Sequence, residues 1–291
     1  MSMKQLLYLL AGLFFATQVM AAESKFEQGL LWKIESNNTP PSYLFGTIHV
    51  DDTDVLAVPA AVTNVFNAAE IFAAEAINDK DSARRFNAAM LFAEPQLPAL
   101  LGNDNYRLID DLLAQRNIPE DVRPRFKPWA AMLTLQQPPK RSGLVLDQML
   151  LRVADQHKKT IVSLETIDEQ IAAFNGMSQP TQIALLGHVQ TNQHKIQNEI
   201  KSMIAAYLDR DLARLMALSR LAFPGGKVSA TQEQEFLSRI LFGRSKVMAE
   251  RLLPLLKKGN AFAACGALHL YGERGMLSLL EQQGFKITKV Y

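Results

Sequence analysis

The chain has 291 residues, 48% of them hydrophobic, so it can bury a sizeable core in one large domain or two small ones. Its formal net charge is only +2. This composition argues against nucleic-acid binding, because a nucleic-acid-binding protein normally carries a clustered basic face. Cys265 is the only cysteine, which excludes an internal disulfide. It lies in an apolar run, so we expect a small buried hydrophobic residue, with a reactive thiol as the alternative.

The N-terminus has the layout of a secretory signal peptide. Lys4 supplies a short positive region, residues 6–19 are almost entirely apolar, and small residues surround a cleavage site near Ala21-Ala22. The alternative is a retained membrane anchor, but the apolar run is shorter than the ~20 residues that a spanning helix requires. We therefore expect that residues 1–21 are removed. The mature domain, residues 22–291, would be periplasmic or secreted and without a stable membrane span.

The first mature segment predicts a β-hairpin. Leu30–Ile34 alternates in hydrophobicity, residues 37–41 form a turn cluster, and Tyr43–Phe45 begins a second strand that leads into Gly46-Thr47-Ile48-His49. A helix is expected over residues 59–69. A short apolar strand, Ile71–Ala74, then runs directly into Glu75.

The middle of the chain is mostly helical, over about residues 80–158 and 178–258. An amphipathic helix over 144–157 precedes a β-branched strand, Thr160–Leu164, which ends on Glu165. This order of a helix, a short turn, a strand and another helix is typical of a βαβ arrangement. Long helical stretches are then expected at 182–220 and at 233–258, and the second of these carries Arg244.

The C-terminal part repeats the strand and turn of the hairpin region. A strand over Phe262–Cys265 leads into Gly266-Ala267-Leu268-His269, and a helix over 272–283 and a final strand over 286–291 follow. The elements together predict an α/β (α+β) fold. In this fold a central mixed β-sheet carries both Gly-x-x-His motifs at strand ends, and it is flanked by helices and a large helical insertion.

The two Gly-x-x-His turns are the strongest functional signal. Ligands of open α/β sheets bind outside the carboxyl ends of the strands, so His49 and His269 are expected to project into one crevice. Glu75 and Glu165 occupy analogous strand ends. Two imidazoles with one or two carboxylates suit a divalent transition metal, which lowers the pKa of a bound water to ~7 and polarises a carbonyl. A spare carboxylate would take the proton from that water, and an arginine would stabilise the oxyanion.

Each of these residues also has a purely structural interpretation. The motif histidines would satisfy buried hydrogen bonds, Glu75 would favour a helix start, and Glu165 would cap the helix that begins near Thr166. The remaining histidines are expected outside the site. They are His157 at a helix end and His188 and His194 in a polar helical stretch.

Four segments together resemble a known family: residues 45–49, residues 127–129, Asp147 with residues 164–166, and residues 265–275. They are similar to the TraB/GumN family, whose Tiki-like members are metal-dependent proteases with paired Gly-x-x-His motifs. The match covers nearly the whole mature chain.

The resemblance implies specific roles for residues of this chain. It implies His49 and His269, with Glu75, as ligands of Mn, Co or Zn, and Glu75, Glu165 and Arg244 as the catalytic set. The chain departs from the family at two positions. Ser245 stands where Asn is common, and Ile77 stands where an acidic residue is common.

Three hypotheses follow. In the first, the protein is a periplasmic metal-dependent hydrolase that acts on a peptide or protein. In the second, the same crevice captures a peptide or an envelope component without cleaving it. In the third, the protein is a structural component of the envelope. The sequence identifies neither the substrate nor the oligomeric state.

Overall fold

The structure is a computed structural model that describes residues 25–36, 39–77, 79–137, 143–221 and 226–291. The predicted signal peptide, residues 1–21, lies outside the described residues. No helix within the described ranges is long and apolar enough to cross a membrane.

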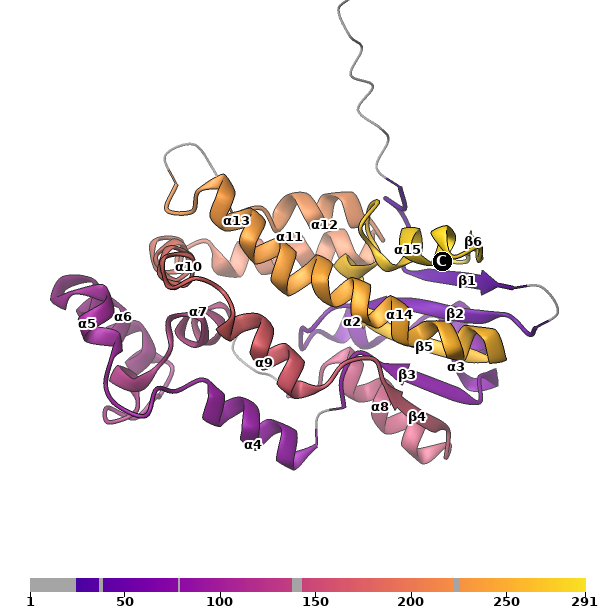
Figure 1. The fold of residues 1–291 in the computed structure, drawn as a ribbon, viewed down its shortest axis with the longest axis horizontal. Helices are drawn as coiled ribbons and strands as arrows, with labels where there is room; N and C mark the ends of the chain where they lie inside the picture. Colours follow the sequence, from indigo (N-terminus) through magenta and orange to yellow (C-terminus); the bar gives the residue numbers. More distant parts are fainter. Residues whose placement is uncertain (1–24, 37–38, 78, 138–142, 222–225) are drawn as a thin grey trace, which may run out of the picture.

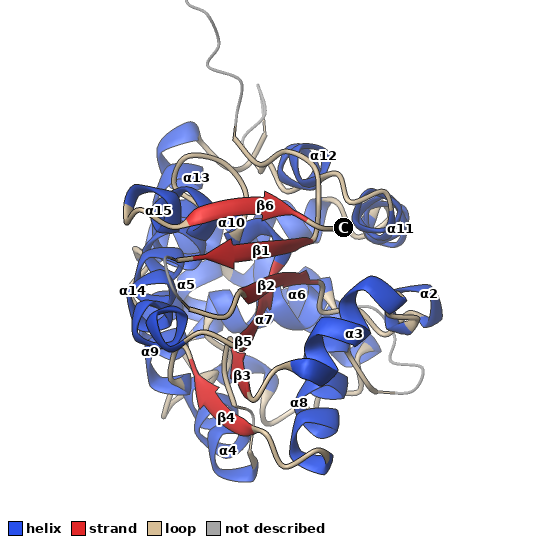
Figure 2. Ribbon diagram, turned by 90° about the vertical axis from the view of Figure 1, so that its right-hand side faces the viewer, coloured by secondary structure: helices blue, strands red, loops and turns tan. Residues whose placement is uncertain are grey.

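A mixed six-stranded sheet forms the centre of the described chain (Figure 2). The strands are β1 (Leu31–Glu35), β2 (Ser42–Thr47), β3 (Ile71–Ala74), β4 (Thr160–Ser163), β5 (Ala261–Gly266) and β6 (Lys286–Lys289). Their order is β4-β3-β5-β2-β1-β6. Strands β4, β3, β5 and β2 are parallel, whereas β1 is antiparallel to both β2 and β6. The predicted mixed sheet, with its N-terminal hairpin, is confirmed.

Strand β5 lies between β2 and β3, although about 190 residues of chain separate it from β3. It is buried along almost its whole length, as expected of a parallel strand covered on both faces. Phe262 packs edge-to-face on Phe66, with ring centroids 5.1 Å apart. Cys265 is fully buried beside Met276, and burial raises the pKa of its thiol, so the predicted hydrophobic role is confirmed.

Helices cover the sheet and form a second body at one end of it (Figure 1). The segments before β4 are α2 (Thr53–Leu56), α3 (Ala60–Ala68), α4 (Lys80–Ala89), α5 (Leu97–Leu101), α6 (Asn103–Gln115), the 3-10 helix η1 (Arg123–Arg125), α7 (Pro128–Gln136) and α8 (Leu146–Gln156). The later ones are α9 (Ile167–Asn175), α10 (Gln179–Thr191), α11 (Ile196–Leu208), α12 (Leu212–Leu218), α13 (Ala230–Phe236), the π-helix η2 (Leu237–Phe242), α14 (Gly243–Lys258), the 3-10 helix η3 (Ala267–His269) and α15 (Met276–Gln282).

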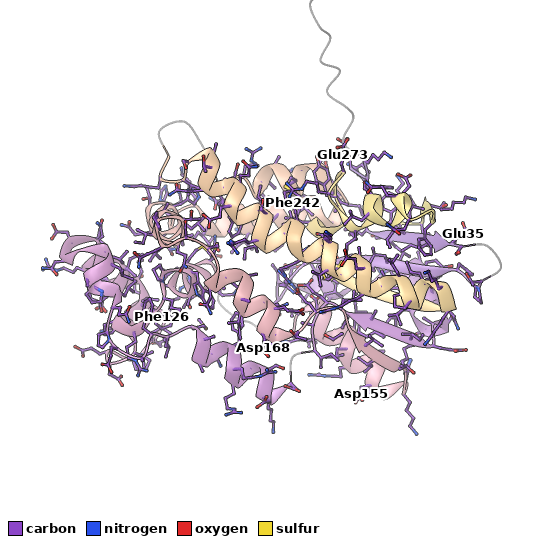
Figure 3. The ribbon with its side chains drawn as sticks, viewed as in Figure 1. Glu35, Phe126, Asp155, Asp168, Phe242 and Glu273 are labelled. Carbon is purple, nitrogen blue, oxygen red and sulfur yellow. The ribbon has the colours of Figure 1, made fainter. Side chains whose placement is uncertain are left out.

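The hydrophobic core is divided between the sheet and the helical end of the molecule. One cluster surrounds the sheet, and a second lies among α5, α6, α7 and α10. Trp129, fully buried in the second cluster, stacks on Phe174 at a centroid distance of 5.0 Å. Figure 3 shows Phe126 in this helical end and Glu35 at the opposite, sheet end of the molecule. The long insertions between the strands therefore carry a core of their own.

Three predicted helices differ from the observed ones. The stretch 182–220 is broken into α10, α11 and α12. The first break lies between Thr191 and Ile196. The second occurs because Arg210 adopts a left-handed conformation (φ 60°) and Asp211 caps a new helix. The stretch 233–258 contains the π-helix η2. The last helix begins at Met276 and not at Gly272, because the chain turns tightly at Gly275, where a Cβ would lie 2.4 Å from the Tyr271 carbonyl oxygen.

Candidate functional site

The four parallel strands end at one edge of the sheet, and each is followed by a predicted site residue. Glu75 comes directly after β3, and Glu165 lies two residues beyond β4. His49 lies two residues beyond β2, and His269 lies three residues beyond β5. The sheet therefore brings the four predicted side chains to the same edge, as the motif analysis anticipated.

The two Gly-x-x-His motifs also contact each other. A Cβ placed on Gly46 would lie 3.0 Å from the Cα of Ala267 and 2.9 Å from the Leu270 side chain. At Gly266 a Cβ would make only ordinary contacts, 3.5 Å from the His269 ring and 3.6 Å from Glu75 Oε2. The glycine of the first motif is thus needed for close approach of the second motif.

This close approach predicts that a methyl group added at Gly46 destabilises the fold. We expect Gly46→Ala to lower the free energy of unfolding by about 1–3 kcal/mol, because the methyl group overpacks a buried contact. Gly187→Ala is the matched control. Gly187 lies inside α10, and its Cβ would meet nothing within 4 Å, so a gain of about 0.5–1 kcal/mol is expected there. Urea denaturation measures both, and equal effects of the two substitutions would contradict the packing argument.

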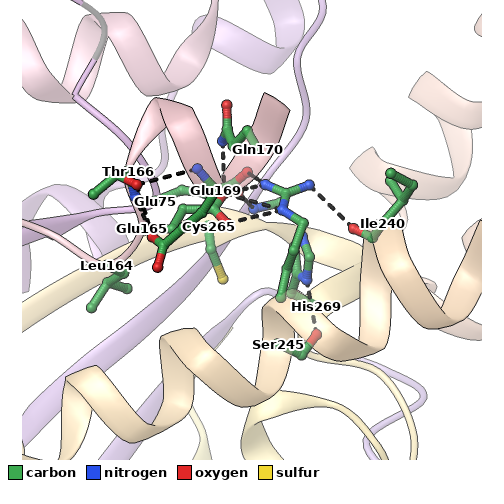
Figure 4. Close-up of polar contacts among 12 residues, drawn as sticks. Glu75, Leu164, Glu165, Thr166, Glu169, Gln170, Ile240, Ser245, Cys265 and His269 are labelled. Atoms are coloured by element: carbon green, nitrogen blue, oxygen red, sulfur yellow. Dashed lines mark hydrogen bonds and ion pairs between the residues drawn. The ribbon is translucent and has the colours of Figure 1, made fainter. Parts of the chain in front are cut away.

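Arg244 joins the two glutamates of the site. Figure 4 shows Glu75 and Glu165 close together and a dashed line between His269 and Ser245. The Nη2 atom of Arg244 lies 2.5 Å from Glu75 Oε1 and also donates to Glu165, while its Nε donates to Glu165 Oε2 at 3.0 Å. Both carboxylates are buried, with 8% of Glu75 and 2% of Glu165 exposed. One cation thus compensates two buried anions.

The alternative capping roles of these glutamates do not apply. Helix α9 is capped by Thr166, which forms a capping box with Glu169, while Glu165 instead accepts from Gln170 Nε2 at 2.6 Å. Helix α4 is capped by Asp79. The Oε2 atom of Glu75 accepts the backbone N–H of Gly266 at 2.7 Å, which ties β3 to the second motif.

These contacts determine the charge of Glu75 and Arg244. Burial disfavours the charged form of Glu75, but the neighbouring His269, Arg244 and His49 and the Gly266 N–H outweigh it and lower its pKa to about 2. Burial likewise lowers the pKa of Arg244, and its bonds to Glu165 and Glu75 raise it well above the ordinary value. Glu75 is therefore ionised and Arg244 protonated across the neutral pH range.

The second motif histidine is buried, and only 5% of its surface is exposed. His269 Nδ1 lies 2.8 Å from Ser245 Oγ, and Ser245 follows Arg244 in the first turn of α14. Burial lowers the pKa of His269 to about 4, so its imidazole is neutral at pH 7. A neutral imidazole is the form that ligates metals.

The first motif histidine lies at the surface, with 58% of its side chain exposed. His49 Nδ1 is 2.8 Å from Asp147 Oδ2, and Asp147 Oδ1 accepts the Thr47 hydroxyl at 2.6 Å. Desolvation lowers the pKa of His49, but the charge of Asp147 outweighs this effect and raises it to about 9, so this imidazole is protonated at pH 7 and must release a proton to bind a metal. The two motif histidines therefore have opposite pKa shifts.

Pattern analysis assigned no role to Asp147 or Ser245. Asp147 lies in the first turn of α8, where an acidic residue is ordinary, and Ser245 appeared only as a departure from a family pattern. The other three histidines lie outside these contacts. His157 is the C-cap of α8, His188 lies in α10, and His194 is exposed after it.

A cavity of about 390 Å³ opens beside these residues. Its polar lining includes His49, Glu75, Asp147 and Gln170. Its apolar lining includes Phe86 of α4, Leu151 of α8 and Val145, which directly precedes α8. The volume is that of a small-ligand pocket, and the mixture of surfaces suits a substrate with both polar and apolar groups.

The donor chemistry of the site fits a divalent metal in part. Each motif histidine has Nδ1 next to an oxygen atom, so Nε2 is the ligand nitrogen, which His269 offers directly and His49 offers after it loses a proton. Both oxygens of Glu75 already accept a hydrogen bond, although each has a second lone pair. In the ranges that the structure describes, no three His, Cys, Asp or Glu side chains are gathered closely enough to hold an ion.

Comparison with known proteins gives a consistent result. The family model described as TraB/PrgY/gumN matches residues 30–289. A metalloprotease TIKI homolog from Nematostella vectensis is 24% identical over 89% of this chain, and metalloprotease TIKI2 from Xenopus tropicalis is 24% identical over 88%. An uncharacterized protein YbaP from Shigella flexneri is 24% identical over 82% of the chain and 87% of its own length. The chain spans 66% and 59% of the length of these two metalloproteases. No solved structure matches significantly.

Proposed function

The chain belongs to the TraB/PrgY/gumN family, and from this premise we propose that it is a periplasmic metal-dependent hydrolase that cleaves peptides or proteins. Several relatives are named as metalloproteases, which supports the reaction class. The periplasmic location rests on the signal-peptide pattern of residues 1–21.

One observation carries the proposal. The carboxyl ends of four parallel strands bring two histidines and two glutamates together at one edge of the sheet, beside a cavity of about 390 Å³. In open α/β sheets this edge is where ligands bind. A purely structural role would not require ionisable side chains at all four strand ends.

In this proposal His49 and His269 hold the metal, with Glu75 as the carboxylate ligand or as the general base. When bound, a divalent metal supplies a water of lowered pKa and polarises the substrate carbonyl. Mn, Co and Zn all suit this donor set.

The other polar residues of the site would accept a proton, stabilise negative charge or hold a neighbouring side chain in place. Glu75 lines the cavity and, as general base, accepts a proton from the attacking water. Arg244 uses four of its five N–H groups on Glu75, Glu165 and the Ile240 carbonyl, so one Nη1 hydrogen is left to stabilise an oxyanion. Glu165 holds Arg244 in place.

The test uses the mature chain, stripped of metal with a chelator and reloaded separately with Mn²⁺, Co²⁺ or Zn²⁺. We expect mass spectrometry of a mixed peptide library to show cleavage that appears with metal and disappears with chelator. Glu75→Gln, which keeps the size of the side chain and removes its charge, should abolish this cleavage. Metal-loaded protein that cleaves no peptide would refute the proposed activity.

A second candidate function is capture of a peptide without cleavage. The observation in its favour is that both oxygens of Glu75 already accept hydrogen bonds, so this carboxylate is committed to Arg244 and Gly266. Calorimetry with candidate peptides in excess chelator separates the two functions. Tight binding that is unchanged by chelator supports capture, and binding that requires the metal supports the hydrolase.

A further inference from the structure

Both motif histidines have Nδ1 next to a side-chain oxygen, His269 in a hydrogen bond and His49 in an ion pair. His269 Nδ1 lies 2.8 Å from Ser245 Oγ, and His49 Nδ1 lies 2.8 Å from Asp147 Oδ2. The two partners come from α14 and α8, and neither belongs to a Gly-x-x-His motif. Two residues that are remote in sequence thus contact equivalent atoms of a repeated motif.

The contacts of Ser245 determine which ring nitrogen of His269 carries the hydrogen. Ser245 Oγ lies 2.9 Å from the Leu241 carbonyl oxygen, which can only accept. A hydroxyl has one hydrogen, and any assignment that withholds it from Leu241 would place two oxygen lone pairs face to face at this distance. Ser245 therefore donates to Leu241 and accepts from Nδ1–H of His269, which leaves the lone pair on Nε2.

Asp147 occupies the corresponding place beside His49, but as the counter-ion of a protonated imidazole, because it raises the pKa of His49 to about 9. An ionised carboxylate only accepts hydrogen bonds. Its Oδ1 accepts the hydroxyl of Thr47, a residue of the first motif, at 2.6 Å, and its Oδ2 faces His49 Nδ1. The first motif therefore supplies both the histidine and a hydroxyl that holds the histidine's partner in place.

A hydroxyl is better suited than a carboxylate to the position beside His269, because buried negative charges already lie nearby. Ser245 is fully buried, and the nearby Glu75 and Glu165 already share a single guanidinium. A third buried carboxylate would have no cation to compensate it, which is costly in a low-dielectric interior. A neutral acceptor orients the imidazole without adding charge.

The π-helix η2 supplies the backbone that makes this arrangement possible. Its Leu241 carbonyl accepts from Ser245, and its Ile240 carbonyl accepts from Arg244 Nη1 at 3.2 Å. One irregular segment thus orients two consecutive side chains of the site. Insertions of this kind are frequent at functional sites.

We propose that Ser245 is a positioning residue that holds His269 in the tautomer protonated at Nδ1, so that this neutral imidazole presents Nε2 as the ligand atom. The inference rests on the proposed function only for the statement that Nε2 binds a metal ion. The tautomer is a property of the chain itself and is measured without metal or substrate.

The experiment is a long-range ¹H–¹⁵N correlation spectrum of the metal-free full chain labelled with ¹⁵N-histidine, recorded at pH 7.5. The cross-peak pattern distinguishes the two neutral tautomers, and the peaks of His269 are assigned by their loss in His269→Gln. We expect the wild-type His269 to show a protonated Nδ1. In Ser245→Ala the population should move toward protonated Nε2.

Ser278→Ala is the matched control. Ser278 is equally buried and donates to the Gly272 carbonyl at 2.9 Å, so this substitution also removes a buried hydroxyl, and the pattern of His269 should not change. A wild-type His269 protonated at Nε2 overturns the proposal, and so does an unchanged pattern in Ser245→Ala. The wild-type spectrum decides by itself if Ser245→Ala does not fold.

A second measurement links the tautomer to metal binding. Titration with Co²⁺, followed by its visible absorption, should show an affinity about 10–100-fold lower in Ser245→Ala than in wild type, the usual cost of losing the partner of a ligating histidine. Ser278→Ala should bind like wild type. If the wild-type chain binds no Co²⁺, the proposed function fails, and the NMR spectrum still decides the tautomer.

Discussion

Replacing Arg244 by methionine is expected to lower the free energy of unfolding by about 3–5 kcal/mol, the usual cost of removing one partner from a buried ion pair. The guanidinium is the cation that contacts both Glu75 and Glu165, and 8% and 2% of these two residues are exposed. Without it, two desolvated carboxylates lie close together, and one must take up a proton for the chain to fold. Urea denaturation at pH 7 measures the loss.

The matched control is Arg251→Met, on the same helix. Arg251 pairs with Glu169 at 2.6 Å and donates to the Leu164 carbonyl at 3.0 Å, but the two paired side chains are 41% and 42% exposed, so a loss of only about 1–2 kcal/mol is expected. Similar losses for the two substitutions would show that Arg244 does not compensate a buried charge.

The same pair of proteins should respond differently to acid. The folded-state pKa of Glu75 is depressed to about 2, so its stabilising contribution is present above its ordinary pKa, near 4.5, and is lost as the pH falls from there toward 2. In Arg244→Met the Glu75 carboxylate is desolvated without this cation, which raises its pKa and favours its protonation. The stability difference between the wild type and this variant should therefore narrow as the pH falls below 5.

Replacing His269 by alanine is expected to reduce metal affinity by more than about 100-fold, which exceeds the range seen when only the partner of a ligand is removed. His269 is neutral at pH 7 because burial lowers its pKa to about 4, so its Nε2 lone pair is available without loss of a proton. His49→Ala should show a loss of the same kind. Calorimetric titration with Mn²⁺ or Co²⁺ measures both.

His194→Ala is the control for these two variants, because His194 is exposed and lies in the turn between α10 and α11. It should bind metal like the wild type. An unchanged affinity in His269→Ala, with the fold intact by circular dichroism, would remove this histidine from the metal site and favour the peptide-capture function.

The sequence predicted the elements that depend on local pattern. Alternating hydrophobicity located the hairpin of β1 and β2, and apolar runs followed by polar residues located β3 and β5. The amphipathic helix before β4 and the buried state of Cys265 were also predicted correctly. Helix boundaries in the insertions were less accurate, because Asp211 starts a new helix and η2 inserts a π-helical segment where the periodicity indicates continuous helix.

Sequence by itself also indicated which side chains meet at the edge of the sheet, because a residue that follows a buried parallel strand must lie at that strand's carboxyl end. The pattern alone thus placed His49, Glu75, Glu165 and His269 at one edge. It also identified both Gly-x-x-His motifs, since a motif is a property of consecutive residues.

Only the tertiary structure decided how these side chains are paired. The partners of Arg244 are 169 and 79 residues away along the chain, and those of His49 and His269 are 98 and 24 residues away. Such contacts depend on the strand order, in which β5 inserts between β2 and β3, and on the π-helix that sets the start of α14. Local pattern contains no information on either, so the opposite pKa shifts of the two motif histidines became visible only in the folded chain.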